Sequence, residues 1–111
     1  MPLAPDMTAA TLFAKKPFDK EKRHKEICEE IHDLWTRKNH DYGDVFHTSF
    51  LEEGMAMPRI RLGDKLARFK TLSRDGAKQM VNDESIRDTL IDLANYAIMT
   101  ILELEEQKDG R

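Results

Sequence analysis

The sequence of 111 residues holds a single cysteine, Cys28. One cysteine excludes an intramolecular disulfide and any zinc site built from cysteines alone. No stretch approaches the roughly 20 consecutive apolar residues that a membrane-spanning helix needs, and the N-terminus lacks the apolar segment of a signal peptide. These absences predict a cytoplasmic protein that has no membrane partner.

Aromatic residues are also scarce, at 7% of the chain, and no run of alternating β-branched residues occurs. Charged residues make up 35% and hydrophobic residues 40%, which is typical of a helical globular protein. The net charge of −3 provides no broad basic surface, so direct binding to duplex DNA is not favoured. A chain of this length corresponds to one domain.

Proline and glycine divide the chain. Three of the four prolines lie within the first 17 residues, which predicts an N-terminal arm over 1–18 and a single helical domain over 19–111. A first helix is predicted over 19–38, with Asp19 as its N-cap and Gly43 as a stop after residues 39–43 leave the helix. A short helix over Thr48–Glu53, closed by Gly54, is predicted to follow.

Two further helices are predicted. One covers 58–73, with Pro58 in its first turn, and Ser73 to Gln79 form a loop after it. The other covers 83–106, is capped by Asn82 or Asp83, and is apolar on nearly every side from Leu90 to Leu104. Such a helix has more apolar surface than two thin neighbours can cover, so a homo-oligomer, a dimer or higher, is expected. The predicted fold is all-α: a small bundle of three main helices plus one or two short ones.

Acidic residues of the last helix suggest a metal site. Glu84, Asp88 and Asp92 are spaced by four, which places them on one strip of the helix. Glu30 borders the apolar stripe of the first helix and could face that strip, and two facing acidic strips would repel each other without a cation. Mg²⁺ or Mn²⁺ prefers such oxygen ligands. The alternative is a solvated helix start, with Asp92 paired to Lys65 or Arg68.

The helix over 58–73 is basic on one side. Arg61, Lys65 and Arg68 are spaced by four and three. Cations beside an acidic metal site are what a nucleoside triphosphate needs, because its phosphates must be neutralised from both sides. The alternative is that these residues form ion pairs with carboxylates of the neighbouring helices.

Three ordered blocks resemble the nucleotide modification associated domain proteins of phages and bacteria. The blocks are KNHDYGDVF (38–46), RLGDKLARFKTL (61–72) and DESIRDTLIDLANYAIMTILEL (83–104). Their shared pattern is Lys-x-x-Asp-Tyr-Gly, then Asp-Lys-x-x-Arg, then Asp-x-x-Asn-Tyr-Ala. The resemblance implies a link to modified nucleotides or to DNA modification, and a location in the host cytoplasm if the protein is phage-encoded.

More distantly, acidic helices around a basic one look like the MazG-like all-α nucleoside triphosphate pyrophosphatases. Those enzymes hold Mg²⁺ between a Glu-Glu-x-x-Glu helix and a Glu-x-x-Asp helix. The likeness implies a metal-dependent nucleotide pyrophosphohydrolase with three groups of residues. Metal would be held by Glu30, Glu84, Asp88 and Asp92. Phosphate charge would be stabilised by Lys65 and Arg68, and the nucleotide would be held by Lys38, Asp41, Tyr42 and Asn95.

The chain departs from the pyrophosphatase signatures. Asp33 stands in the place of the third glutamate, and Glu84, Asp88 and Asp92 are spaced by four rather than three. A second hypothesis is therefore a non-catalytic protein that binds or sequesters a nucleotide, or an accessory subunit of a DNA-modification system. A third is a helical interaction protein whose polar strips form only salt bridges. The sequence selects neither the nucleotide nor the bond cut.

Overall fold

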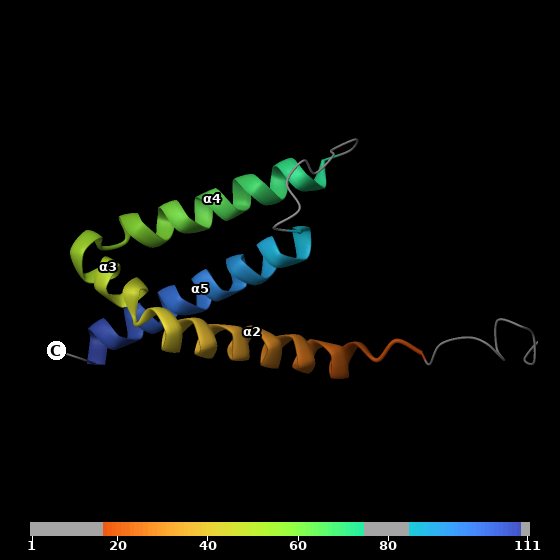
Figure 1. The fold of residues 1–111 in the computed structure, drawn as a ribbon. Helices are drawn as coiled ribbons and strands as arrows, with labels where there is room; N and C mark the ends of the chain where they lie inside the picture. Colours follow the sequence, from red (N-terminus) through yellow and green to blue (C-terminus); the bar gives the residue numbers. More distant parts are fainter. Residues whose placement is uncertain (1–16, 75–84, 110–111) are drawn as a thin grey trace, which may run out of the picture.

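The computed structural model describes residues 17–74 and 85–109. These residues form four helices and no strand: α2 (Lys20–Tyr42), α3 (Val45–Glu53), α4 (Ala56–Ser73) and α5 (Ile86–Asp109) (Figure 1). The predicted all-α fold, with three long helices and a short one, is confirmed. The predictions for the arm before residue 17, and for most of the loop before α5, lie outside the described residues.

Helix α2 begins as predicted and ends later than predicted. The Asp19 side chain accepts a hydrogen bond from the Lys22 backbone N–H at 3.0 Å, so Asp19 is the N-cap. The prediction that residues 39–43 leave the helix was wrong for the first four, which remain helical through Tyr42. Polar residues cost a helix only fractions of a kcal/mol, on the order of 0.5 each, whereas Gly43 has a φ of 70° and does end it.

Helix α3 begins three residues before its predicted start. Asp44 is its N-cap, because the Asp44 carboxylate accepts a hydrogen bond from the His47 backbone N–H at 3.4 Å. Gly54 closes α3 as predicted: its φ is 64° and its N–H donates to the Phe50 carbonyl at 2.8 Å. Helix α4 then begins at Ala56, and the buried Pro58 lies in its first turn. Two tight turns, at Gly43 and Gly54, therefore connect α3 to α2 on one side and to α4 on the other.

Helix α5 begins at Ile86, not at 83, because Ser85 and Asp88 form a reciprocal capping box. The Asp88 N–H donates to the Ser85 hydroxyl at 3.1 Å, and the Ser85 N–H donates to the Asp88 carboxylate at 3.2 Å. The predicted caps, Asn82 and Asp83, lie outside the described residues. Asp88 thus has a structural role at the start of α5.

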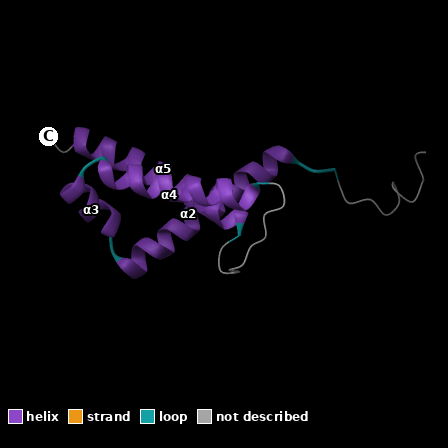
Figure 2. Cartoon of the chain, turned by 90° about the horizontal axis from the view of Figure 1, so that it is seen from above, coloured by secondary structure: helices purple, strands orange, loops and turns teal. Residues whose placement is uncertain are grey.

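Helix α5 is central and contacts each of the other three helices (Figure 1). Figure 2 shows the same helices from above, joined by short loops where the loops are described. The core lies where α3, the start of α4 and α5 meet, and it consists of Phe46, Phe50 and Met57, with Tyr96 and Met99 packed against it. No side chain of α2 is fully buried. Among the described residues, no helix is long and apolar enough to cross a membrane.

Candidate functional site

A pocket of about 250 Å³ opens between the last turns of α2, the start of α3, helix α4 and the middle of α5. We call it the α2–α5 pocket. Its lining residues are Trp35, Lys38, Asn39, Tyr42, Gly43, Val45, Phe46, Arg61, Asp92, Asn95, Tyr96 and Met99. Three of the four predicted nucleotide-binding residues, and one predicted metal ligand, therefore line a single pocket.

The extra turn of α2 decides which residues reach the pocket. Lys38 and Tyr42 are four apart on one face of the helix, and both line the pocket. Asp41 points in another direction, because successive helical residues are about 100° apart. Asp41 does not line the pocket; its exposed carboxylate lies 3.2 Å from His40 Nδ1. The structure thus brings Tyr42, but not Asp41, beside Asp92 and Asn95.

One wall of the pocket is aromatic. The rings of Phe46 and Tyr96 stack with centroids 6.1 Å apart, and the Arg61 guanidinium lies 5.9 Å from the Tyr96 centroid. Arg61 also donates from Nε to the Met57 sulfur at 3.4 Å. Cation–π contact and this hydrogen bond hold Arg61 beside the pocket although it is exposed. Arg61 belongs to the basic strip predicted from the sequence, although the phosphate contacts were assigned to Lys65 and Arg68 and not to Arg61.

The polar wall centres on Asp92. Its carboxylate lies 2.9 Å from Lys65 Nζ and 4.0 Å from Lys38 Nζ, so the ion pair named as the alternative is present. Asn95 donates from Nδ2 to the Ile31 carbonyl on α2 at 3.3 Å. Arg68, also predicted to contact phosphates, is half-buried on α4 and does not line the pocket. Of the two predicted cations, only Lys65 lies beside the site.

A second cavity of about 400 Å³ lies between α2 and α5. Glu30, Asp88 and Asp92 all line it, so Glu30 of α2 faces Asp88 and Asp92 of α5 across the cavity. Glu84 lies outside the described residues. Lys38 and Asp92 also line the α2–α5 pocket, which makes the two cavities neighbours. An all-oxygen donor set of this kind fits Mg²⁺ or Mn²⁺ in chemistry.

The carboxylates of this second cavity are engaged by protein groups. Arg87 donates two hydrogen bonds of 2.7 Å to Glu30, and this contact lowers the pKa of the Glu30 carboxyl. Within the described part of the chain, Glu30, Asp88 and Asp92 do not bring three ligand atoms within 4.8 Å of one another. Binding a cation here would require Glu30 to leave Arg87 and Asp92 to leave Lys65. The predicted metal site stays a prediction.

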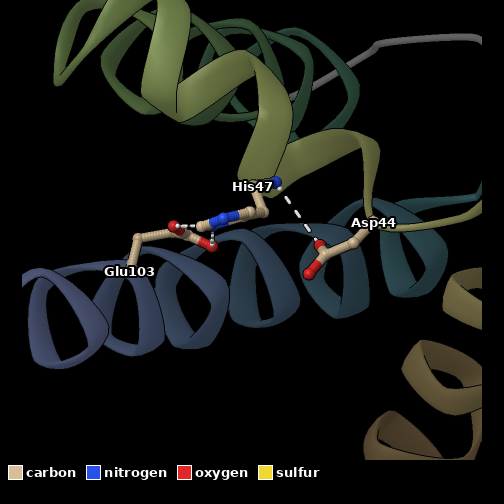
Figure 3. A group of neighbouring side chains, drawn as sticks. All are labelled: Asp44, His47 and Glu103. Atoms are coloured by element: carbon tan, nitrogen blue, oxygen red, sulfur yellow. Dashed lines mark hydrogen bonds and ion pairs between the residues drawn. The ribbon is translucent and has the colours of Figure 1, made fainter. Parts of the chain in front are cut away.

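Sequence reasoning missed a second polar cluster, which joins α3 to α5 (Figure 3). His47 Nδ1 lies 2.8 Å from Glu103 Oε2 and 3.4 Å from Glu106 Oε2, and Asp44 completes the group. The hydrogen bond to Glu103 raises the pKa of His47. Glu103 is only 5% exposed, and a carboxylate within the apolar run ILEL was the available signal, since a buried acid needs a partner.

The comparisons with known proteins give one match. Residues 38–104 match the family described as Nucleotide modification associated domain 1. Neither the curated proteins nor the solved structures give a match. The matched segment contains all three sequence blocks, and each block contributes to the α2–α5 pocket: Lys38 and Tyr42 from the first, Arg61 from the second, and Asp92, Asn95 and Tyr96 from the third. The likeness to MazG-like pyrophosphatases stays a prediction.

Proposed function

Because the chain belongs to the Nucleotide modification associated domain 1 family, we propose that the α2–α5 pocket binds a nucleotide or a modified nucleotide. The observation that carries this proposal is that all three sequence blocks, distant in the chain, line one pocket. If the three blocks served only to stabilise the fold, Lys38, Arg61 and Asp92 would not need to line the same pocket.

The lining chemistry suits a nucleotide. Trp35 and Tyr42 offer aromatic surface for a base, and bases stack on such side chains. Lys38 and Arg61 provide positive charge for phosphates. The volume of about 250 Å³ lies a little below the roughly 300–1,000 Å³ of common ligand pockets. The pocket would therefore enclose the base, and the phosphates would extend past Lys38 to the second cavity.

We further propose metal-dependent pyrophosphohydrolysis as the activity. Glu30, Glu84, Asp88 and Asp92 would hold Mg²⁺ or Mn²⁺, which would supply charge stabilisation on the phosphates. Water would add to the α-phosphorus and the α–β phosphoanhydride bond would break, giving a nucleoside monophosphate and pyrophosphate. Lys65, released from Asp92, would contact the developing negative charge, and one carboxylate would orient the attacking water.

A second candidate is a non-catalytic protein that binds or sequesters a nucleotide, or that serves a DNA-modification system as an accessory subunit. The ion pairs Glu30–Arg87 and Asp92–Lys65 favour this candidate, because they already neutralise two of the predicted metal ligands. In that case the α2–α5 pocket would bind a nucleotide and leave its phosphates intact. Under both candidates the protein would act in the cytoplasm as a homo-oligomer.

A screen of canonical and modified nucleoside triphosphates with Mg²⁺ or Mn²⁺ separates the candidates. Binding is measured by calorimetry and turnover by release of pyrophosphate, for the native chain, Asp92→Asn and the control Asp33→Asn. Asp33 is an exposed acid on α2 outside both cavities. Turnover that is lost in Asp92→Asn alone supports the enzyme. Binding without turnover supports sequestration, and absence of binding to every nucleotide contradicts both candidates.

A further inference from the structure

The face of α5 opposite its buried side carries an apolar stripe. Its residues are spaced by four, three, four and three: Leu90, Ala94, Ala97, Ile101 and Leu104. At about 100° per residue they fall within an arc of roughly 80°. We call this stripe the α5 seam. Its three large side chains, Leu90, Ile101 and Leu104, are 45%, 54% and 48% exposed.

The neighbouring helices do not cover the seam. The residues of α5 that contact α3 and the core lie on the opposite face: Met99 packs against the core and Glu103 contacts His47. The alternating spacing of three and four is the a/d repeat of a coiled coil, in which such a stripe packs against another helix. Arg87 and Lys108 continue the same repeat and place a charge at each end. The apolar part is therefore about 21 Å long.

We propose that the α5 seam packs against the α5 seam of a second copy of the chain, in an antiparallel arrangement with two-fold symmetry. The two-fold axis passes close to Ala97. This inference goes beyond the proposed function and does not depend on nucleotide binding. A homo-oligomer was expected because α5 is apolar on nearly every side. The proposal adds which surface of α5 forms the contact and in which direction the two helices run.

Side-chain size favours the antiparallel direction. With Ala97 at the axis, Leu90 faces Leu104 of the second copy, and Ala94 lies beside Ile101 of the second copy. The small Ala94 then meets the large Ile101 on both sides of the axis, as close packing requires. A parallel pair would place both copies of Ala94 and Ala97 against themselves and leave a thin, poorly filled middle between bulky ends.

Charge favours the same direction. Of the three carboxylates in the last two turns of α5, only Glu105 borders the seam, because Glu103 and Glu106 contact His47 on the other side of the helix. A parallel pair would bring the two copies of Glu105 to one end, where like charges repel. The antiparallel pair separates them and places each Glu105 toward the N-terminal half of the other helix, where the helix dipole is favourable.

The proposed interface leaves the candidate site open. Asp92, Asn95 and Tyr96 project from the other side of α5 toward α2, α3 and α4, where they line the α2–α5 pocket. Each copy would therefore carry its own complete pocket, facing away from the seam. A substitution that breaks the seam is therefore expected to lower the measured mass of the particle and to leave the contacts within the pocket unchanged.

Cysteine crosslinking tests the direction. In a Cys28→Ser background, Ala97→Cys is expected to form a disulfide with its own copy under mild oxidation, because the axis brings the two positions together. Leu90→Cys and Leu104→Cys are expected to crosslink only when the two variants are co-expressed, giving a mixed dimer. Self-crosslinking of Leu90→Cys and of Leu104→Cys would show a parallel pair, and absence of all three products would show that the seams do not meet. Either result overturns the proposal.

Light scattering tests the surface. Ile101→Glu is expected to reduce the measured mass from two chains to one, because it places a charge within the apolar seam, beside Ala94 of the second copy. The matched control is Ile60→Glu on α4, where Ile60 is 63% exposed and lies outside the seam; this variant should remain dimeric. Circular dichroism checks that both variants stay helical, and if Ile101→Glu unfolds, the crosslinking pattern decides. A native chain that runs as a monomer, or a control that dissociates instead, contradicts the proposal.

Discussion

Helix α5 meets its neighbours through two different kinds of contact. Against α3 and α4 it buries apolar side chains around Phe46, Phe50 and Met57. Against α2 it makes two polar contacts: the Arg87–Glu30 ion pair and the hydrogen bond from Asn95 to the Ile31 carbonyl. No side chain of α2 is fully buried. The first contact therefore holds the fold, and the second surrounds two cavities that a ligand could occupy.

The difference explains where a site can exist. A well-packed apolar interface excludes ligands and changes little, because loss of buried area is costly. A polar interface can exchange its internal partners for a ligand's groups with less loss. Lys38 and Arg87 each contact a carboxylate across this interface, and Lys65 of α4 contacts Asp92 beside it. A phosphate could draw the cations away and a metal ion could draw the carboxylates away.

The largest effect is expected from damage to the apolar contact. Phe50→Ala should lower the free energy of unfolding by about 3 kcal/mol or more, because it leaves a cavity in a small core. The matched control is Leu51→Ala, since Leu51 is the exposed neighbour on the same helix; it should change stability by roughly 0.5 kcal/mol or less. Urea denaturation measures both. Equal losses in the two variants would show that Phe50 is not the core residue that this comparison requires.

A smaller effect is expected at the polar contact. Asn95→Ala removes the hydrogen bond to the Ile31 carbonyl and should cost about 1 kcal/mol of stability. It should also weaken nucleotide binding, because it loosens α2 beside the pocket. Calorimetry and urea denaturation measure the two quantities. Unchanged affinity together with the expected loss of stability would confine Asn95 to a structural role.

The His47–Glu103 pair predicts a pH dependence. The Glu103 carboxylate raises the pKa of His47 above its ordinary value of 6.5. The stability that this pair contributes is therefore fully present below pH 6.5, and it is lost as pH rises through the raised pKa of the folded state. The midpoint of thermal unfolding should fall across this window in the native chain and fall less in His47→Gln. A native midpoint that rises there would contradict the sign.

The smallest effect on stability is expected from the exposed Arg87–Glu30 pair. Arg87→Ala should leave the urea midpoint nearly unchanged, since exposed ion pairs contribute little. It should strengthen Mg²⁺ or Mn²⁺ binding, because Glu30 loses its protein partner. Metal titration by calorimetry checks this, with Arg59→Ala as control, since Arg59 is exposed on α4 and lines neither cavity. Equal metal affinity in native and Arg87→Ala chains would remove Glu30 from the proposed ligand set.

Local features were predictable from the sequence because they depend on adjacent residues. Asp19, Gly43, Gly54 and Pro58 occupy the cap and turn positions that were predicted. The end of α2 was missed because polar residues only weakly oppose a helix. Because residues 39–42 were not expected to be helical, the different directions of the Asp41 and Tyr42 side chains were missed as well. Ser85 was missed as a cap because Asn82 and Asp83 before it were equally suitable.

Contacts between distant residues were predictable only where a face could be defined. Asp92 and Asn95 are three residues apart, which places them on one face of α5, and both line the pocket. The His47–Glu103 and Arg87–Glu30 pairs join residues more than 50 positions apart. No local spacing selects one distant partner among many charged residues, so these pairs needed the fold.

The most direct test of the central claim is nucleotide affinity in two arginine variants. Arg61 lines the α2–α5 pocket, whereas Arg59 is exposed on the same helix and does not line it. Calorimetry with the nucleotide that binds best in the screen should show about a tenfold loss of affinity for Arg61→Ala, as expected for one charged contact. Arg59→Ala should bind as the native chain does. Equal affinity in all three proteins would show that the nucleotide does not bind in this pocket.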